Sequence, residues 1–206
     1  MENKVIQIVM KKYVITLLLT FFLFSFNAFA QNVTITESYD KDVKIRKTGM
    51  AILGTWAVGN MITGAIGRKQ STGQNAYFHE MNLIWNVVNL GIAGAGYYFT
   101  ATGEMPENAS ALLDNQVSFQ KTLLFNAGLD LAYIAGGFYL MERAKNTTNK
   151  PERLKGYGKS VILQGSFLFV FDIVLHTIHN KQSSQISDFL SHLQVGPNQV
   201  GLVLNF

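Results

Sequence analysis

Charged residues are almost absent from four long hydrophobic segments, which cover residues 48–66, 81–103, 122–141 and 160–180. Asp130 and Asp172 are the only carboxylates in these segments, and none of the segments contains Lys or Arg. Each segment is close to the ~20 residues that cross about 30 Å of hydrocarbon as a helix. A soluble bundle would require a charged outer face on every helix, which these segments lack. The pattern therefore predicts an all-α, transmembrane four-helix bundle over residues 48–180, with spans at about 48–66, 80–102, 119–141 and 159–179.

Polar residues nevertheless recur along one face of the second segment. Asn82, Asn86 and Asn89 follow steps of four and three residues, which place them on one side of a helix. At about 1.5 Å per residue, Asn89 and Asp130 fall near the middle of the membrane, and Asp172 lies on the outer side of the centre. We therefore predict a polar column inside the bundle, formed by Asn60, Asn82, Asn86, Asn89, Asn126, Asp130, Gln164, Asp172 and His176.

The amides and the carboxylates of this column lead to different expectations. Interhelical hydrogen bonds of asparagines hold membrane helices together, each contributing on the order of 0.6 kcal/mol. An ionised carboxylate at the centre of a span costs roughly 2.5 kcal/mol or more. Because no Lys or Arg lies at a similar depth, Asp130 and Asp172 must be protonated, be hydrogen-bonded by asparagines or pair with His176. The amides are therefore candidates for structure, and the two carboxylates are candidates for chemistry.

A metal site is an alternative use of the fourth segment. Asp172, His176 and His179 share one helix face at i, i+4 and i+7, and carboxylate with imidazole suits Zn or Fe. The same spacing also arises from simple hydrogen bonds. We therefore expect no cofactor, with a metal at Asp172, His176 and His179 as the alternative.

The amino terminus has the pattern of a secretory signal peptide over residues 1–30. Lys11 and Lys12 precede an apolar run at residues 14–26, and the run is followed by an Ala-x-Ala site that ends at Ala30. The apolar run is shorter than the ~20 residues of a span, which favours cleavage over an uncleaved anchor. The mature chain is then expected to begin at Gln31, with a periplasmic segment at residues 31–47. Translation from Met10 rather than Met1 is also compatible with this pattern.

Basic residues concentrate in the loops after the first and third segments. The loop at residues 142–159 has six Lys and Arg residues against two acids, whereas residues 104–121 contain three acids and Lys121 as their only base. The positive-inside rule therefore places the first and third loops in the cytoplasm. The prediction is a multi-pass protein of the bacterial inner membrane, with the lipid bilayer as partner and both mature termini in the periplasm.

Bulk composition narrows the remaining choices. The 206 residues are 48% hydrophobic and 15% charged, against about 25% charged in soluble domains. There is no cysteine, which excludes disulfides and thiolate chemistry, and no nucleic-acid-binding motif. Glycines in the segments predict close helix packing, within the chain or in a homo-oligomer or with a membrane partner. In the tail, residues 181–206, Val200, Leu202, Leu204 and Phe206 alternate as in a strand.

Three stretches, "FHEMNLIWNVVNLGIAG", "NAGLDLAYIAGGFYL" and "GSFLFVFDIVLHTIHN", resemble an uncharacterised family of bacterial four-span membrane proteins with a signal peptide. The resemblance covers about residues 48–180 and implies no activity. The chain has no Walker, Gly-x-Ser-x-Gly or His-Glu-x-x-His motif, which argues against an enzyme. The short loops and the lack of motifs favour a structural or assembly component. The alternatives are a small transporter or proton-coupled component that uses Asp130 and Asp172, and an intramembrane metalloenzyme that uses Asp172 and His176.

Overall fold

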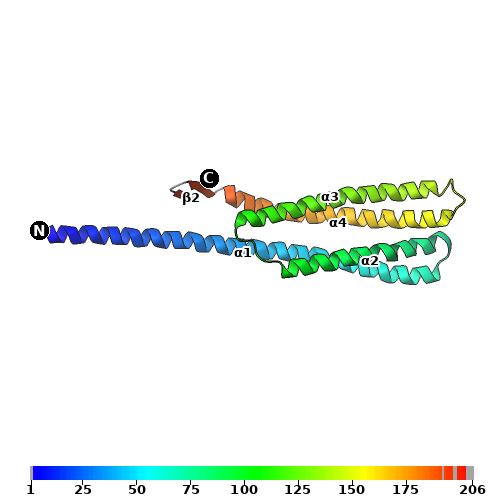
Figure 1. Ribbon diagram of the computed structural model, residues 1–206, viewed down its shortest axis with the longest axis horizontal. Coiled ribbons are helices and arrows are strands. Elements are labelled where there is room, and N and C mark those ends of the chain that lie inside the picture. The colour runs from blue at the N-terminus through cyan, green and yellow to red at the C-terminus, as the bar shows by residue number, and fades with distance from the viewer. Residues whose placement is uncertain (1, 192, 197–198, 203–206) are drawn as a thin grey trace. The chain divides into compact units, whose positions relative to one another are not determined.

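The structure is a computed structural model that describes the backbone of residues 2–191, 193–196 and 199–202, and the side chains of residues 35–184, 186 and 187. It divides into two units, residues 1–40 and residues 41–206, which are treated separately below. Figure 1 shows the elements in chain order: α1 (Glu2–Gln70), α2 (Gly73–Thr102), α3 (Ala109–Arg143), α4 (Pro151–Ser191), β1 (Leu193–Gly196) and β2 (Gln199–Leu202).

In the first unit, the described backbone belongs to α1. The predicted signal peptide lies here, and its side chains are outside the described residues, so its cleavage before Gln31 stays a prediction. Helix α1 continues through residues 31–47, since that stretch contains no Pro or Gly that would favour a helix end.

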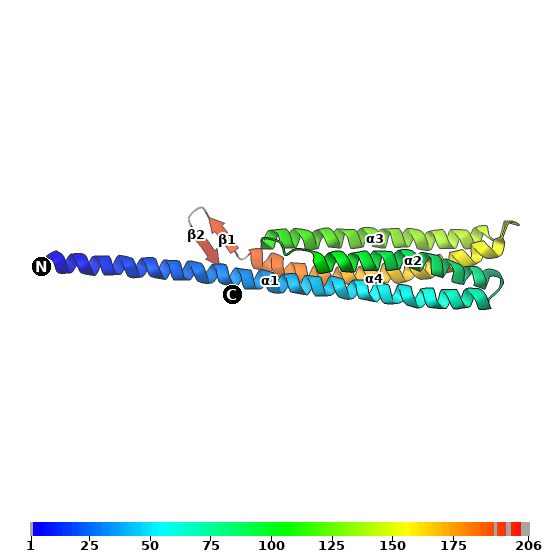
Figure 2. The same cartoon turned by 60° about the horizontal axis from the view of Figure 1, so that its bottom comes forward.

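The second unit is a bundle of antiparallel helices, made by residues 41–70 of α1 together with α2, α3 and α4. The α1–α2 turn and the α3–α4 loop lie at the same end of this unit (Figures 1 and 2). Gly73 of the turn lies so close to the start of α4 that a Cβ added to it would be 3.0 Å from Glu152 Oε1. We call this the basic end, because it carries Arg68, Lys69, Arg143, Lys145, Lys150, Arg153, Lys155 and Lys159. At the opposite end, the side chain of Asn108 caps α3 by accepting a hydrogen bond from the Ala111 amide at 2.9 Å.

The interior of the bundle is unusually polar, and its outer faces are apolar. The largest fully buried side chains among the described residues are Leu112, His179, Gln116, Gln164, Asn86 and Ser160. Large apolar side chains point outward instead, such as Val88, which is 61% exposed, and Phe99, which is 70% exposed. Exposed apolar side chains are unfavourable in water and favourable in hydrocarbon. Polar groups of a protein in hydrocarbon must in turn be hydrogen-bonded inside it.

Three helices in the described part of the chain are long and apolar enough to cross a membrane: Ile35–Gln70, Ala109–Arg143 and Pro151–Ser184. This confirms the prediction of an all-helical bundle with membrane-spanning character in its coarse form. Helix α2, with 30 residues, falls short of that hydropathy level. The physical reason is the stripe of Asn82, Asn86 and Asn89, whose polar side chains lower the mean hydropathy of the helix. After Glu80 this helix contains no charged residue.

Two short strands follow α4. Strands β1 and β2 pair as an antiparallel hairpin in which Val195 is opposite Val200. Two of the four alternating tail residues, Val200 and Leu202, lie in β2, as expected from the sequence. Leu204 and Phe206 lie outside the described residues.

Candidate functional site

The first polar cluster, which we call the amide network, connects α1, α2 and α4. The Oδ1 atom of Asn82 accepts hydrogen bonds from Ser160 Oγ at 2.6 Å and from Gln164 Nε2 at 3.0 Å. On α1, Trp56 Nε1 donates to Gln164 Oε1 at 2.9 Å. Gln164 Nε2 also lies 3.3 Å from Asn60 Oδ1. One buried glutamine therefore joins three helices through both of its amide atoms.

The asparagine stripe of α2 extends this network along the bundle. Asn86 Nδ2 donates to the carbonyl oxygen of Asn82 at 2.8 Å, and Asn89 Nδ2 donates to Asn86 Oδ1 at 3.3 Å. All three asparagines are buried. The stripe therefore faces the bundle interior, and the uncharged apolar residues of α2 form its outer side.

Ser160 and Trp56 belong to the network although the sequence did not single them out as polar partners. Each lies one helical turn before a predicted member, Ser160 before Gln164 and Trp56 before Asn60. That i, i+4 relation could have indicated them. Of the other predicted residues, Asn60 and Asn126 are half-buried.

The second cluster is a carboxyl pair. Asp130 of α3 and Asp172 of α4 are both buried, line the same pocket and lie close enough to interact through their carboxyl groups. Two ionised carboxylates can only accept, so a hydrogen bond between them requires a proton on at least one of the two. The Oδ2 atom of Asp130 is buried and has no donor among the described residues. The sequence offered His176 as the partner of Asp172, whereas the structure brings Asp172 to Asp130.

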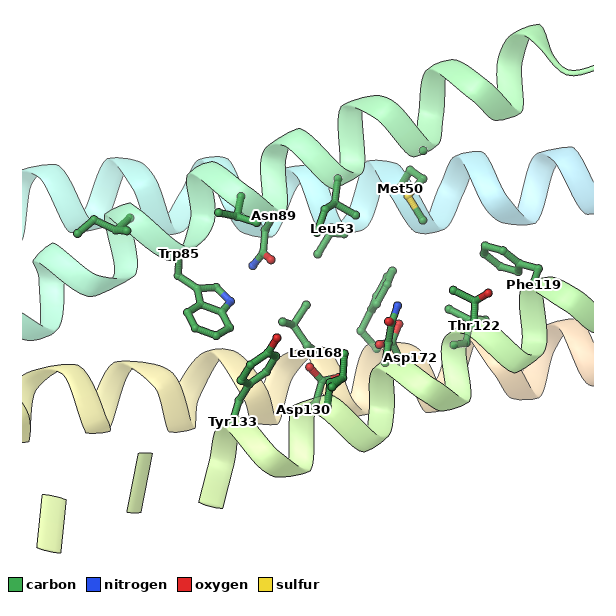
Figure 3. A pocket seen from close by; sticks show the side chains of 18 residues that line it. Met50, Leu53, Trp85, Asn89, Phe119, Thr122, Asp130, Tyr133, Leu168 and Asp172 are labelled. Carbon is green, nitrogen blue, oxygen red and sulfur yellow. The ribbon is translucent and has the colours of Figure 1, made fainter. Parts of the chain in front are cut away.

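The carboxyl pair lines a pocket of about 540 Å³ between α2 and α3, with further lining residues from α1 and α4 (Figure 3). Asn89 and Asn126 also line it, and no Lys, Arg or His of the described residues does. Trp85 and Tyr133 meet edge to face across the pocket, with ring centroids 4.9 Å apart. Figure 3 shows these two rings on one side of the carboxyl pair and Phe119 on the other.

A third cluster contains His179, the last of the three predicted metal ligands. His179 is fully buried, and its Nδ1 atom lies 3.3 Å from Asp42 Oδ1. Asp42 also forms an ion pair with Arg46, in which Oδ2 lies 2.7 Å from Nε. The Arg46 guanidinium lies 4.2 Å from the centroid of the Phe119 ring. The helix face that carries Asp172 and His179 is therefore buried, but each of the two residues contacts a different carboxylate.

His176, between them, is half-buried. Among the described residues, no group of three or more His, Cys, Asp or Glu side chains is arranged to hold a metal ion. Asp172 instead lies beside Asp130, and His179 lies beside Asp42.

At the basic end, Glu80 joins α2 to α1 and α4. Its carboxylate accepts hydrogen bonds from Tyr157 Oη at 2.5 Å and from Arg68 Nε at 2.8 Å. Glu80 precedes the charge-free segment that begins at Met81. The hydrogen bond from Tyr157, followed by that from Arg68, holds the pKa of Glu80 below its ordinary value.

Helices with apolar outer faces and a hydrogen-bonded polar interior define the class of this molecule as a helical bundle of membrane-spanning character. The chain belongs to the family of unknown function DUF6992, whose pattern matches residues 52–173. The matched region includes the amide network and the carboxyl pair, and it leaves out Asp42, Arg46 and His179. No curated protein and no solved structure matches the chain.

Proposed function

We propose that the protein is a four-span inner-membrane protein in which Asp130 and Asp172 take up and release protons, as a small transporter or proton-coupled component. The observation that carries this proposal is the carboxyl pair itself, buried at a pocket without a basic lining residue in the described part of the chain. Acids within membrane spans are costly and typically serve proton or ion pathways. Two neighbouring carboxyl groups can take up and release protons without a rearrangement of the bundle.

Helix α2 acts as the fourth span in this proposal. Its length of 30 residues corresponds to about 45 Å of helix, more than the hydrocarbon thickness requires. Its large exposed residues are apolar, and its asparagines of the stripe are buried and form hydrogen bonds inside the bundle. A helix of this kind is compatible with lipid on one side and with α1 and α4 on the other.

The basic end faces the cytoplasm in this proposal, and the mature termini face the periplasm. A reporter that is active only in the periplasm should therefore be inactive when it is fused at Thr147 and active when it is fused at Asn108. The reverse result would invert the topology, and activity at both sites would contradict four spans.

A structural role is the second candidate, and the amide network supports it. Gln164 and Asn82 tie three helices together without leaving their amide oxygens unpaired. This role is compatible with the first, because a rigid network next to a carboxyl pair keeps the pair in place. The test below separates a protein that has only the structural role from one that has both.

The test is infrared titration of the purified protein together with a proton-flux assay in liposomes. A protonated carboxyl has a distinct C=O band, and this band should change with pH in the wild type and be lost when both Asp130→Asn and Asp172→Asn are present. Proton flux down an imposed gradient should fall in each single variant. Asp114→Asn is the matched control, since it makes the same change at an exposed position of α3. Unchanged spectra and flux in the double variant would leave the structural role alone.

A further inference from the structure

We propose that the pocket between α2 and α3 binds a lipophilic ammonium compound, a protonated amine on an apolar or aromatic body, which displaces one proton from the carboxyl pair. This inference rests on the proposed proton-coupled function and names its ligand class. It is drawn from the polarity of the pocket, its aromatic walls and its position in the bundle.

The size of the pocket suits a small organic ligand. Its volume of about 540 Å³ lies within the roughly 300–1,000 Å³ of typical ligand sites. Most of its lining is apolar or aromatic, from residues such as Leu53, Leu129 and Leu168. Such walls bind hydrocarbon and exclude strongly hydrated ions. The ligand must therefore carry a substantial apolar part.

The polar groups of the pocket select a cation that donates hydrogen bonds. Asp130 Oδ2 is buried without a hydrogen-bond partner among the described residues, and a buried acceptor left in this way destabilises the protein until a donor is supplied. An ammonium N–H would supply that donor, whereas an anion would be repelled. Among the side chains that the structure describes, no Lys or Arg lines the pocket to compete for the carboxyl pair. The rings of Trp85 and Tyr133 offer additional binding for a cation through their faces.

Access to the pocket is from the apolar exterior of the bundle. α3 packs along α4 and α2 packs on α4, whereas the backbones of α2 and α3 stay further apart and are bridged by the side chains of Trp85 and Tyr133. The pocket residues Ile84, Val88 and Ile92 of α2 are all more than half exposed, so the rim of the pocket is an outward apolar surface. A ligand that partitions into hydrocarbon reaches this rim directly, which again favours a lipophilic compound.

Charge balance determines the proton count. An uncompensated negative charge is costly among apolar walls, so the neutral arrangement without ligand has a proton on both carboxyls. When one monovalent ammonium enters, the neutral arrangement has one carboxylate and one carboxyl. One O–H bond is broken, and its proton leaves to solvent; no other bond changes. One proton is therefore released for each ammonium bound.

The experiment uses 4-phenylbutylamine as the cationic probe and 4-phenylbutanol as its uncharged analogue. Calorimetric titrations of the full chain in detergent, in two buffers of different ionisation enthalpy, give the affinity and the number of protons released. The amine should bind with one proton released, and the alcohol should bind about tenfold more weakly or worse, as expected for loss of a charge-assisted hydrogen bond. Asp130→Asn should weaken amine binding by a similar factor, and Asp114→Asn should not.

A second variant keeps the test valid if Asp130→Asn does not fold. Val88→Trp places a larger side chain at the exposed rim of the pocket and leaves both carboxyls in the sequence. It should abolish amine binding while the infrared titration of the pair is retained. Equal binding of amine and alcohol, or amine binding that persists in Val88→Trp, would overturn the inference. If the pair titrates but no amine binds, the ligand class is wrong and the proton-coupled function stands. If the pair does not titrate, the proposed function itself fails.

Discussion

The amide network and the carboxyl pair are both buried polar groups in the same bundle, yet they differ in how well their hydrogen bonds are balanced. In the network, Gln164 uses its amide oxygen and nitrogen, and Asn82 Oδ1 accepts twice. In the pair, two acceptors face each other and Asp130 Oδ2 has no donor among the described residues. Balanced polar groups stiffen a core, whereas unbalanced ones leave a capacity to bind a proton or a ligand. Burial alone would not have separated the two.

The glycines of the bundle differ in how closely a neighbouring helix approaches them. A Cβ on Gly64 of α1 would lie 2.9 Å from the His79 carbonyl oxygen of α2, and one on Gly137 of α3 would lie 2.7 Å from the Gly158 carbonyl oxygen of α4. Along the pocket helices, Gly91, Gly94 and Gly128 would have nothing within 4 Å of an added Cβ. Close packing within the chain is therefore observed at Gly64 and Gly137, whereas packing of the other three glycines against a second chain stays a prediction.

Replacing Gln164 with Leu should have the largest effect on stability. The change removes the hydrogen bonds to Trp56 and Asn82 and leaves their buried polar atoms without those partners. We expect the free energy of unfolding to fall by about 1–3 kcal/mol, measured by thermal or denaturant unfolding in detergent. Asn180→Leu, at an exposed position of the same helix, is the control and should change it little. A Gln164→Leu protein as stable as the wild type would remove the structural role of the network.

Replacing Gly137 with Ala should have the next largest effect. The added methyl group would meet backbone atoms of α4, the Gly158 carbonyl oxygen and the Ile162 amide nitrogen, which cannot move unless the helices separate. The expected loss is about 1–3 kcal/mol, as for overpacking. Gly128→Ala on the same helix adds the same methyl group to open space and should be neutral or slightly stabilising. If both variants melt at the same temperature, α3 and α4 are not held at the observed separation.

Replacing Asp130 with Asn should hardly change stability, in contrast with its effect on proton binding. The amide can donate to Asp172, so the pair keeps a hydrogen bond without sharing a proton. We expect a change of less than about 1 kcal/mol. Asp130→Leu, which leaves Asp172 without its partner, should cost more. A larger loss in Asp130→Asn than in Gln164→Leu would reverse the comparison and make the pair a structural element.

Local periodicity explains which parts of this site the sequence could predict. Asn82, Asn86 and Asn89 share a face because helical spacing alone places them there, and that face is buried. The contact between Asp130 and Asp172 depends on how far α3 and α4 slide past each other. With 35 and 41 residues, these helices extend beyond the expected spans, so the span centres did not give their relative offset. The sequence therefore placed Asp130 and Asp172 at different depths, and it could not indicate the pocket.

Replacing Tyr157 with Phe at the basic end should have the smallest effect on the free energy of unfolding. This variant also allows the pH dependence of stability to be tested. Tyr157→Phe removes the hydrogen bond to Glu80 and retains a ring that can meet Tyr77 edge to face. The loss should be below about 1 kcal/mol, because the Glu80 and Arg68 side chains are partly exposed to solvent.

The pKa of Glu80 is lower in the folded protein than its ordinary value. Its contribution to stability is therefore present above the ordinary pKa and is lost as the pH falls through the folded pKa. The melting temperatures of wild type and Tyr157→Phe should thus differ at neutral pH and converge in acid. A difference that grows in acid would mean that Tyr157 stabilises the bundle by a route other than the ionised Glu80.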